Sequence, residues 1–144
     1  QDVFRKAKLA MRSWEMFPKT FVDLVNAGPF EEGRVVATLF QAPGFWTLNA
    51  CRIVYSVDER SDDVDRFGFA YGTVGRHLAK GEERFLVEFD RHEESVWYEV
   101  YCFSKANHWL SCVAYAYFRL QQSRFRRLSG LSMAAAVDHS AQAA

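Results

Sequence analysis

The chain has 144 residues, of which 49% are hydrophobic and 25% charged, and its 18 basic and 18 acidic residues leave no net charge. This length and composition are typical of one folded, soluble domain and exclude an intrinsically disordered chain. A neutral chain lacks the basic field that holds nucleic acid, so we expect no nucleic-acid partner. The longest strongly apolar run, 113–118, is far shorter than the ~20 residues of a transmembrane helix.

The N-terminal residues predict a short amphipathic helix. Apolar residues recur there at helical spacing, at Phe4, Ala7, Met11 and Trp14. Asp2 is available as an N-cap, and the helix is expected to end before Pro18, because the residue before a proline disfavours helical geometry. Residues 20–32 have the composition of a loop, with Asn, Gly and Pro close together.

Strand-like segments then follow one another along the chain. They are rich in β-branched and aromatic residues and cover 34–40, 45–57, 67–73, 83–89 and 96–103. The connections between them are short and polar, including the acidic segment 58–63. Because parallel crossovers need a dozen or more residues, these connections predict antiparallel pairing.

A long helix is predicted from about Asn107 to the C-terminal region. Its apolar stripe consists of Trp109, Val113, Tyr117, Leu120, Phe125, Leu128 and Leu131. This helix is the element long enough to cover a sheet with one apolar face. The sequence therefore predicts an α+β fold in which a mostly antiparallel sheet packs around a long C-terminal helix, with a short N-terminal helix.

We expect one domain over 1–137 and a flexible tail over 138–144. The chain starts at Gln1 without Met, which we interpret as a missing native N-terminal segment. The three cysteines, Cys51, Cys102 and Cys112, are an odd number at unrelated spacings. They predict free thiols, an intracellular location and no zinc site.

Two faces of the segment 67–73 differ sharply in side-chain size. One carries Phe67, Phe69, Tyr71 and Thr73, and the other carries Gly68, Ala70 and Gly72. A glycine-rich face predicts the close approach of a helix, another strand or a ligand, and we favour a helix. The aromatic–glycine alternation is somewhat like an RNA-recognition strand, but the preceding strand arrives without the helix which that fold requires.

An ordered series of motifs resembles the uncharacterised family called "domain of unknown function nineteen-ninety", found in plants and bacteria. The motifs are 68–73, His77, 81–85, 96–99, 103–104 and 108–110, with Trp14 and 49–55 upstream. The resemblance extends from about Val3 to Leu128 and departs from the family pattern at Ala106, where proline is common. It implies a further N-terminal segment, but no reaction, cofactor or catalytic residue.

The order of elements is also similar to that of the START-like and Bet v 1-like helix-grip proteins. In those proteins, a curved antiparallel sheet wraps a long C-terminal helix around an apolar cavity. The likeness concerns the fold, and a fold by itself does not determine function. It implies an apolar cavity between the sheet and the last helix.

Candidate chemistry gathers where two predicted strands meet. Tyr71, Thr73, His77, Glu82 and Glu83 lie within thirteen positions, and a hairpin would bring their hydroxyl, imidazole and carboxylate groups together. Acid–base catalysis and ligand contact are both open, and so is the simpler interpretation that these groups hydrogen-bond the loop and stabilise the hairpin.

Three hypotheses about function remain. The first is the binding of a small, largely apolar ligand, for which the candidate residues are Tyr55, Tyr71, Thr73, His77, Glu83 and Tyr98. We expect the three tyrosines to face inward. The second is an enzyme that uses Tyr71, His77 and Glu83, without a cofactor. The third is an interaction or membrane-peripheral module, in which an anionic partner meets Arg119, Arg124, Arg126 and Arg127. A solvated helix face, with cations toward the helix C-terminus, is the simpler explanation of these arginines and the one we favour.

Overall fold

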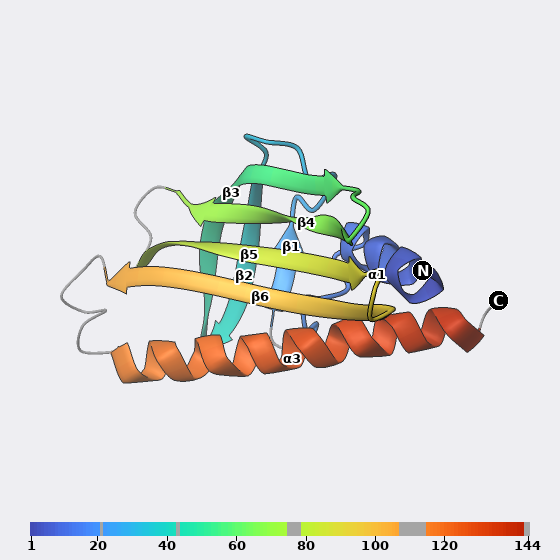
Figure 1. The fold of residues 1–144 in the computed structure, drawn as a ribbon. Coiled ribbons are helices and arrows are strands. Elements are labelled where there is room, and N and C mark those ends of the chain that lie inside the picture. The colour runs from blue at the N-terminus through green and yellow to red at the C-terminus, as the bar shows by residue number, and fades with distance from the viewer. Residues whose placement is uncertain (21, 43, 75–78, 107–114, 143–144) are drawn as a thin grey trace.

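The described part of the protein has a sheet flanked by two helices, and the α+β class predicted from the sequence is confirmed (Figure 1). The computed structural model describes residues 1–20, 22–42, 44–74, 79–106 and 115–142. In chain order, the elements are α1 (Asp2–Arg12), β1 (Val22–Val25), β2 (Val35–Ala42), β3 (Phe45–Glu59), β4 (Val64–Thr73), β5 (Ala79–Asp90), β6 (Ser95–Ala106) and α3 (Tyr115–Gln142).

The sheet contains six strands in sequence order, and every neighbouring pair is antiparallel. Its first strand, β1, lies within residues that the sequence predicts as loop, and it pairs with β2 from Val22 opposite Phe40 to Val25 opposite Ala37. Four residues are too few for a clear alternation, so the pairing with β2 defines this strand. The other strands appear where the sequence predicts them, with longer ends.

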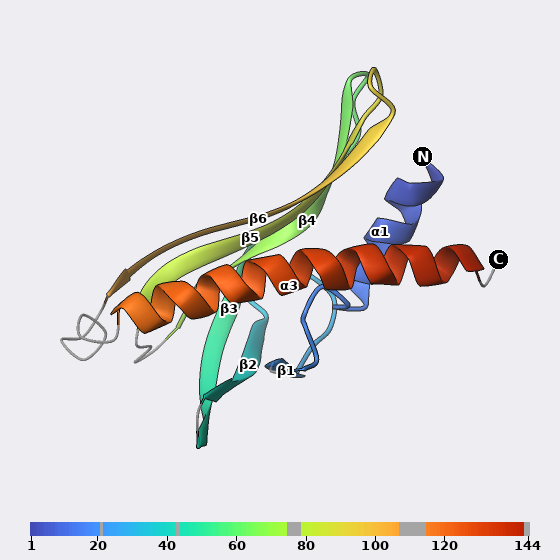
Figure 2. The ribbon, with the colours of Figure 1, turned by 90° about the horizontal axis from the view of Figure 1, so that it is seen from below.

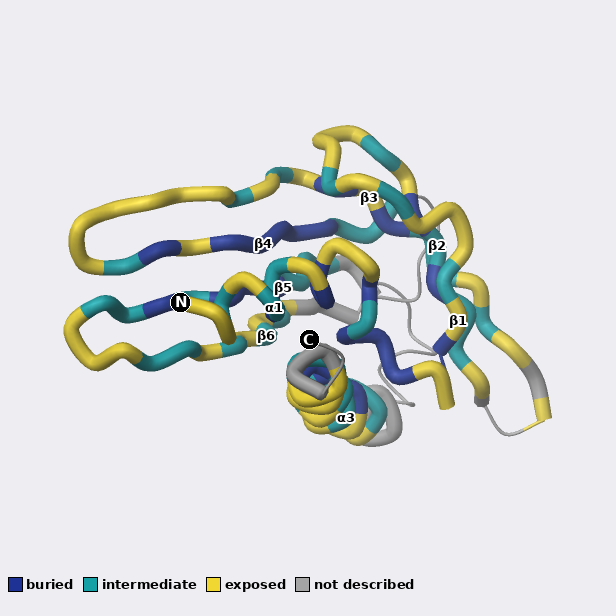
Figure 3. Tube along the Cα trace, turned by 90° about the vertical axis from the view of Figure 1, so that its right-hand side faces the viewer, coloured by how far each residue is buried: buried dark blue, intermediate teal, exposed yellow. Residues whose placement is uncertain are grey.

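The sheet is strongly curved, and α3 passes across its concave side (Figure 2). Phe67, Phe69 and Tyr71 of β4 share one buried cluster with Phe125 and Met133 of α3. Figure 3, viewed toward the end of α3, shows buried residues on β4 and its neighbours, and the buried set also includes Met11, Trp14 and Phe17 from α1 and the segment after it. The concave face and α3 therefore enclose the hydrophobic core.

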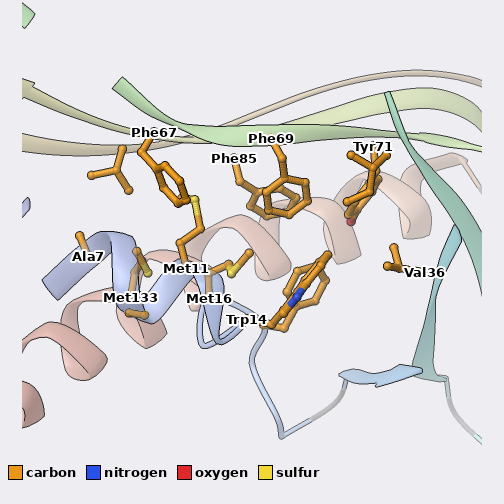
Figure 4. Packing of buried hydrophobic residues seen from close by; sticks show 14 of the residues in the cluster. Ala7, Met11, Trp14, Met16, Val36, Phe67, Phe69, Tyr71, Phe85 and Met133 are labelled. Carbon is orange, nitrogen blue, oxygen red and sulfur yellow. The ribbon is translucent and has the colours of Figure 1, made fainter. Parts of the chain in front are cut away.

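Aromatic rings pack against one another in the described part of this interior (Figure 4). Phe17 lies near its centre, with ring centroids 5.5 Å from Phe85 and 5.4 Å from Phe125. The Phe69 ring stacks on Phe85 at 5.2 Å and on Phe30 at 4.0 Å. Such pairs contribute beyond the area they bury, so the many phenylalanines stabilise the core.

Helix α1 ends at Arg12, before Pro18 as predicted. The N-cap is Gln1 instead of Asp2, and the Asp2 carboxylate lies in the first turn, where it pairs with Arg5 and Lys6 at 2.7 Å each. A carboxylate in this turn is favourable because it faces the positive end of the helix dipole.

The face of α3 that meets the core differs from the predicted stripe. Leu120 and Leu131 are exposed, by 66% and 58%, whereas Phe125, Ser129 and Met133 are buried. Of the predicted stripe, Phe125 is buried and Leu128 packs against the core, whereas Leu120 and Leu131 do not. Ser129 takes a buried position that a search for apolar spacing does not identify. Trp109 and Val113, and the side chain of Tyr117, lie outside the described residues.

The glycine and alanine face of β4 lies on the convex side of the sheet, away from α3. A Cβ at Gly68 would overlap the Phe85 carbonyl oxygen, and the Leu86 side chain lies over the same position. At Gly72, the nearest side-chain atom belongs to Val54 of β3. Neighbouring strands approach these glycines, so our preference for a helix there is wrong.

Candidate functional site

A row of side chains crosses the concave face of the sheet and contains the predicted hairpin residues. The strand registers place Ile53 opposite Tyr71, Tyr71 opposite Glu83, and Glu83 opposite Cys102. Residues paired across antiparallel strands point to the same face, so the row runs without interruption from β3 to β6. Its centre is the Tyr71–Glu83 pair.

The Tyr71 hydroxyl donates a hydrogen bond to the Glu83 Oε2 atom at 2.6 Å. Burial raises the pKa of Glu83 from its ordinary value of 4.5 to about 7, although the Tyr71 hydrogen bond and the nearby Arg126 lower it. Burial also raises the pKa of Tyr71, and the Glu83 charge raises it further. At neutral pH, Tyr71 therefore stays protonated, while Glu83 is able to accept or release a proton.

Thr73 has the structural role considered for it in the sequence. Its Oγ1 atom accepts a hydrogen bond from the Gly81 backbone N–H at 3.2 Å, which joins the facing ends of β4 and β5. The hairpin thus brings Tyr71, Thr73 and Glu83 together, as predicted. His77 lies outside the described residues.

Of the other two predicted tyrosines, one faces the interior and one does not. The Tyr98 hydroxyl lies 2.7 Å from Ser129 Oγ, so it connects β6 to α3. Tyr55 follows a register irregularity between Ile53 and Tyr55 and pairs with Ala70, on the convex face. The prediction that Tyr55 faces inward is wrong, because a bulge reverses the alternation of a strand.

Arg84 confirms the outward position of Tyr55. The pKa of Arg84 is raised, first by its hydrogen bond to Glu99 and also by Tyr55. The Arg84–Glu99 pair spans 2.6 Å between β5 and β6, and both side chains are well exposed. Tyr55 therefore lies beside the Arg84–Glu99 ion pair, on the convex side of the sheet.

Two thiols lie close to Glu83 and were not predicted as part of the site. Burial, followed by the Glu83 charge, raises the pKa of Cys51 to about 12 and that of Cys102 to about 11. Gln122 Nε2 of α3 lies 3.7 Å from Cys102 Sγ. Both cysteines are free, and neutral thiols of this kind are poor nucleophiles. Cys112 lies outside the described residues.

The predicted arginine cluster of α3 divides between two sides of the helix. Arg126 is half-buried, and its charge lowers the pKa of Glu83 and of Cys102. The charge of Arg119 also lowers the pKa of Cys102. Arg124 and Arg127 are exposed, on the side turned away from Phe125 and Ser129. Sequence reasoning did not connect Arg126 with Glu83, because the effect of the arginine charge on that carboxyl group depends on how α3 crosses the sheet.

A groove of about 690 Å³ lies elsewhere, between α1 and the neighbouring ends of β3, β4 and β5. It was not predicted, because its lining comes from the first twelve residues and from positions 58–91. Within the described ranges, no group of three or more His, Cys, Asp or Glu side chains is placed to hold a metal ion. In the same ranges, neither helix has the length and apolar character needed to cross a membrane.

Sequence comparisons identify relatives of the chain. It is 36% identical over 132 residues to a UPF0548 protein of Dictyostelium discoideum, covering 86% of this chain and 61% of that protein. It is 33% identical over 131 residues to a UPF0548 protein of Arabidopsis thaliana, covering 90% of this chain and 63% of that protein.

A UPF0548 protein of Deinococcus radiodurans is 46% identical over 114 residues, which cover 72% of this chain and 55% of that protein. The chain thus spans less than two thirds of the length of these relatives. No solved structure gives a significant match. The sequence model of the domain of unknown function DUF1990 matches residues 1–132, so the chain belongs to the DUF1990 family.

Proposed function

We propose that the protein binds a small, largely apolar molecule between the concave face of the sheet and α3. The observation that carries this proposal is the hydrogen-bonded Tyr71–Glu83 pair on an otherwise largely apolar face, with Tyr71 buried and Glu83 partly buried. Burial of a carboxyl group is unfavourable. The next inward positions of the same strand are occupied by the apolar residues Phe85 and Val87, so packing alone does not require a carboxyl group at position 83. A carboxyl group kept at such a position, with a strongly raised pKa, is typical of functional sites.

The remaining proposed contacts follow from the same face. Tyr98 and Thr73 contribute hydroxyl groups near the pair, and His77, although outside the described residues, follows the end of β4. The order of a curved antiparallel sheet and a long C-terminal helix is similar to that of START-like and Bet v 1-like helix-grip proteins. This analogy supports ligand binding at the level of fold alone.

A second candidate function is acid–base catalysis at the same place. A carboxyl group with a pKa of about 7 is matched to proton transfer at neutral pH, and Tyr71 beside it is a protonated hydrogen-bond donor. In this alternative, Glu83 takes a proton from a bound substrate while Tyr71 orients the carboxylate. The proposed role of His77 in the catalytic group remains a prediction.

A third proposal concerns partners and compartment. The exposed side chains of Arg119, Arg124 and Arg127 would attract an anionic partner. Arg126 is half-buried on the same helix, so the four charges do not form one continuous patch.

The free thiols of Cys51 and Cys102 support an intracellular, reducing compartment.

Native mass spectrometry tests the ligand proposal. The protein is purified from cells that produce it naturally, and its mass is measured under native and denaturing conditions. We expect a bound molecule that is lost on denaturation and is retained less by Glu83→Gln, which removes the charge while keeping the shape. Glu93→Gln, at an exposed turn, serves as the matched control and should retain the molecule.

Two results would contradict the proposal. One is a wild-type protein whose native mass never exceeds that of the chain. The other is equal retention by wild type, Glu83→Gln and Tyr71→Phe, because the carboxyl group would then have no part in binding. If a ligand is found, its turnover over time distinguishes the enzyme from the binding protein.

A further inference from the structure

The groove between α1 and the sheet is lined by more positive than negative side chains. Its cations are Arg5, Lys8, Arg12, Arg60 and Arg91. Its carboxylates are Asp2, Asp58 and Asp65. Five cations and three carboxylates leave a surplus of two positive charges on a chain whose net charge is zero. A hollow with a surplus of one sign concentrates ligands of the opposite sign.

Each carboxylate of the groove already has a close cation. Asp2 pairs with Arg5, Asp58 with Lys8 and Asp65 with Arg91, at 2.7 Å in all three pairs. These carboxylates are therefore largely neutralised. A cationic ligand would have to compete with side chains held beside them, so the charge arrangement disfavours it.

Two arginines of the groove remain outside these close pairs. Arg12 reaches Asp58 only at 3.6 Å, behind the shorter contact of Lys8. Arg60 lies in the exposed turn after β3; among the described residues it forms no salt bridge, although its charge helps to lower the pKa of Asp65, after the larger effects of Arg91. The guanidinium groups of Arg12 and Arg60 are thus the surplus charges of the lining, and guanidinium groups bind phosphate in bidentate geometry.

The groove also has an apolar part. Phe4 and Leu9 of α1 line it, and Leu9 is 51% exposed although it is a large apolar side chain. The volume of about 690 Å³ falls within the usual range of small-molecule sites. A molecule that combines an anionic group with a small apolar body would match both parts.

We propose that this groove binds an organic phosphate, with Arg12 and Arg60 contacting the phosphate group and Phe4 and Leu9 contacting the apolar body. The site is separate from the Tyr71–Glu83 pair, which lies on the concave face near α3, and it depends on none of the same residues. Free phosphate esters and the phosphate headgroup of a lipid share this chemistry.

Isothermal titration with phenyl phosphate tests the proposal directly. We expect saturable binding that is tighter than that of inorganic phosphate, because the phenyl ring adds apolar contact. The double variant Arg12→Gln, Arg60→Gln should weaken it by about tenfold or more, as the loss of charge-assisted hydrogen bonds implies. Arg52→Gln removes an exposed arginine outside the groove and should bind like wild type.

A second measurement identifies the source of the phosphate. Sedimentation with phosphatidylcholine vesicles, with and without phosphatidic acid, shows whether a lipid headgroup is bound. Binding that requires phosphatidic acid, Arg12 and Arg60 supports the proposal with a lipid as source, whereas binding of phenyl phosphate alone supports a soluble ester. The proposal would be overturned if the protein bound neither phenyl phosphate nor vesicles with phosphatidic acid, or if Arg52→Gln weakened binding as much as the double variant. Thermal melts of each variant show that the fold is kept.

Discussion

The hydroxyl groups of Tyr98 and Ser129 meet at 2.7 Å and join the edge strand β6 to the middle of α3. Ser129 is fully buried, and burial raises the pKa of Tyr98. The contact thus satisfies two polar groups inside an aromatic core. It also specifies which face of α3 meets the sheet, because an apolar residue at 129 would leave the tyrosine hydroxyl without this partner.

Removal of one hydroxyl from this pair should destabilise the protein. Tyr98→Phe leaves the Ser129 hydroxyl buried, and we expect the free energy of unfolding to fall by about 1–3 kcal/mol in urea titrations. Adding Ser129→Ala to Tyr98→Phe should recover part of the loss, since no buried group is then unsatisfied. Tyr101→Phe, at an exposed tyrosine, should change stability by less than about 0.5 kcal/mol.

Glu83 should make stability depend on pH. Its pKa rises from 4.5 in the unfolded chain to about 7 in the folded protein, so its contribution to stability is complete below pH 4.5 and is lost as pH rises to about 7. The shift corresponds to about 3 kcal/mol. Urea titrations at several pH values should show a smaller decrease in Glu83→Gln than in wild type or Glu93→Gln. Equal decreases in all three proteins would place the cause elsewhere.

Gly68 should tolerate no side chain. A Cβ there would overlap the backbone carbonyl oxygen of Phe85, which cannot move without breaking the pairing of β4 with β5. We expect Gly68→Ala to lower the free energy of unfolding by about 1–3 kcal/mol or more. Gly130→Ala is the control, because a Cβ at that helical position meets no atom within 4 Å apart from the backbone of its own helix. It should be neutral or stabilise the helix by up to about 1 kcal/mol.

The orientation of α3 is tested by a pair of truncations. Phe125→Ala removes a buried ring that packs against Phe17 and Phe85, and should destabilise the protein by about 3–5 kcal/mol. Leu120→Ala removes an exposed side chain and should cost less than about 0.5 kcal/mol. Thermal and urea unfolding measure both. A larger effect at Leu120 than at Phe125 would contradict this orientation of α3.

The thiols of Cys51 and Cys102 should resist alkylation in the folded protein. Their pKa values of about 12 and 11 keep them protonated at neutral pH, and the thiolate is the reactive form. Mass spectrometry of digests after brief iodoacetamide treatment should find both unmodified, and both modified in denaturant. A disulfide involving any of the three cysteines, Cys112 included, would contradict the proposed intracellular location.

The Tyr71–Glu83 pair was accessible from the sequence because its geometry is local. Alternation along β4 places Tyr71 on the face of Phe67 and Phe69, and a short connection then brings β5 back beside it. The side-chain period of a strand and the antiparallel return of a hairpin need no knowledge of distant residues. The α+β class follows from the same kind of local pattern.

The tertiary structure alone decided which surfaces meet. A register irregularity after Ile53 turns Tyr55 to the convex face, and the crossing of α3 buries Ser129 while it leaves Leu120 exposed. The groove at α1 joins charges from positions 1–12 to others at positions 58–91. Packing between distant elements selects the buried face of a helix by shape and hydrogen-bond complementarity, and hydropathy along the chain does not record that choice.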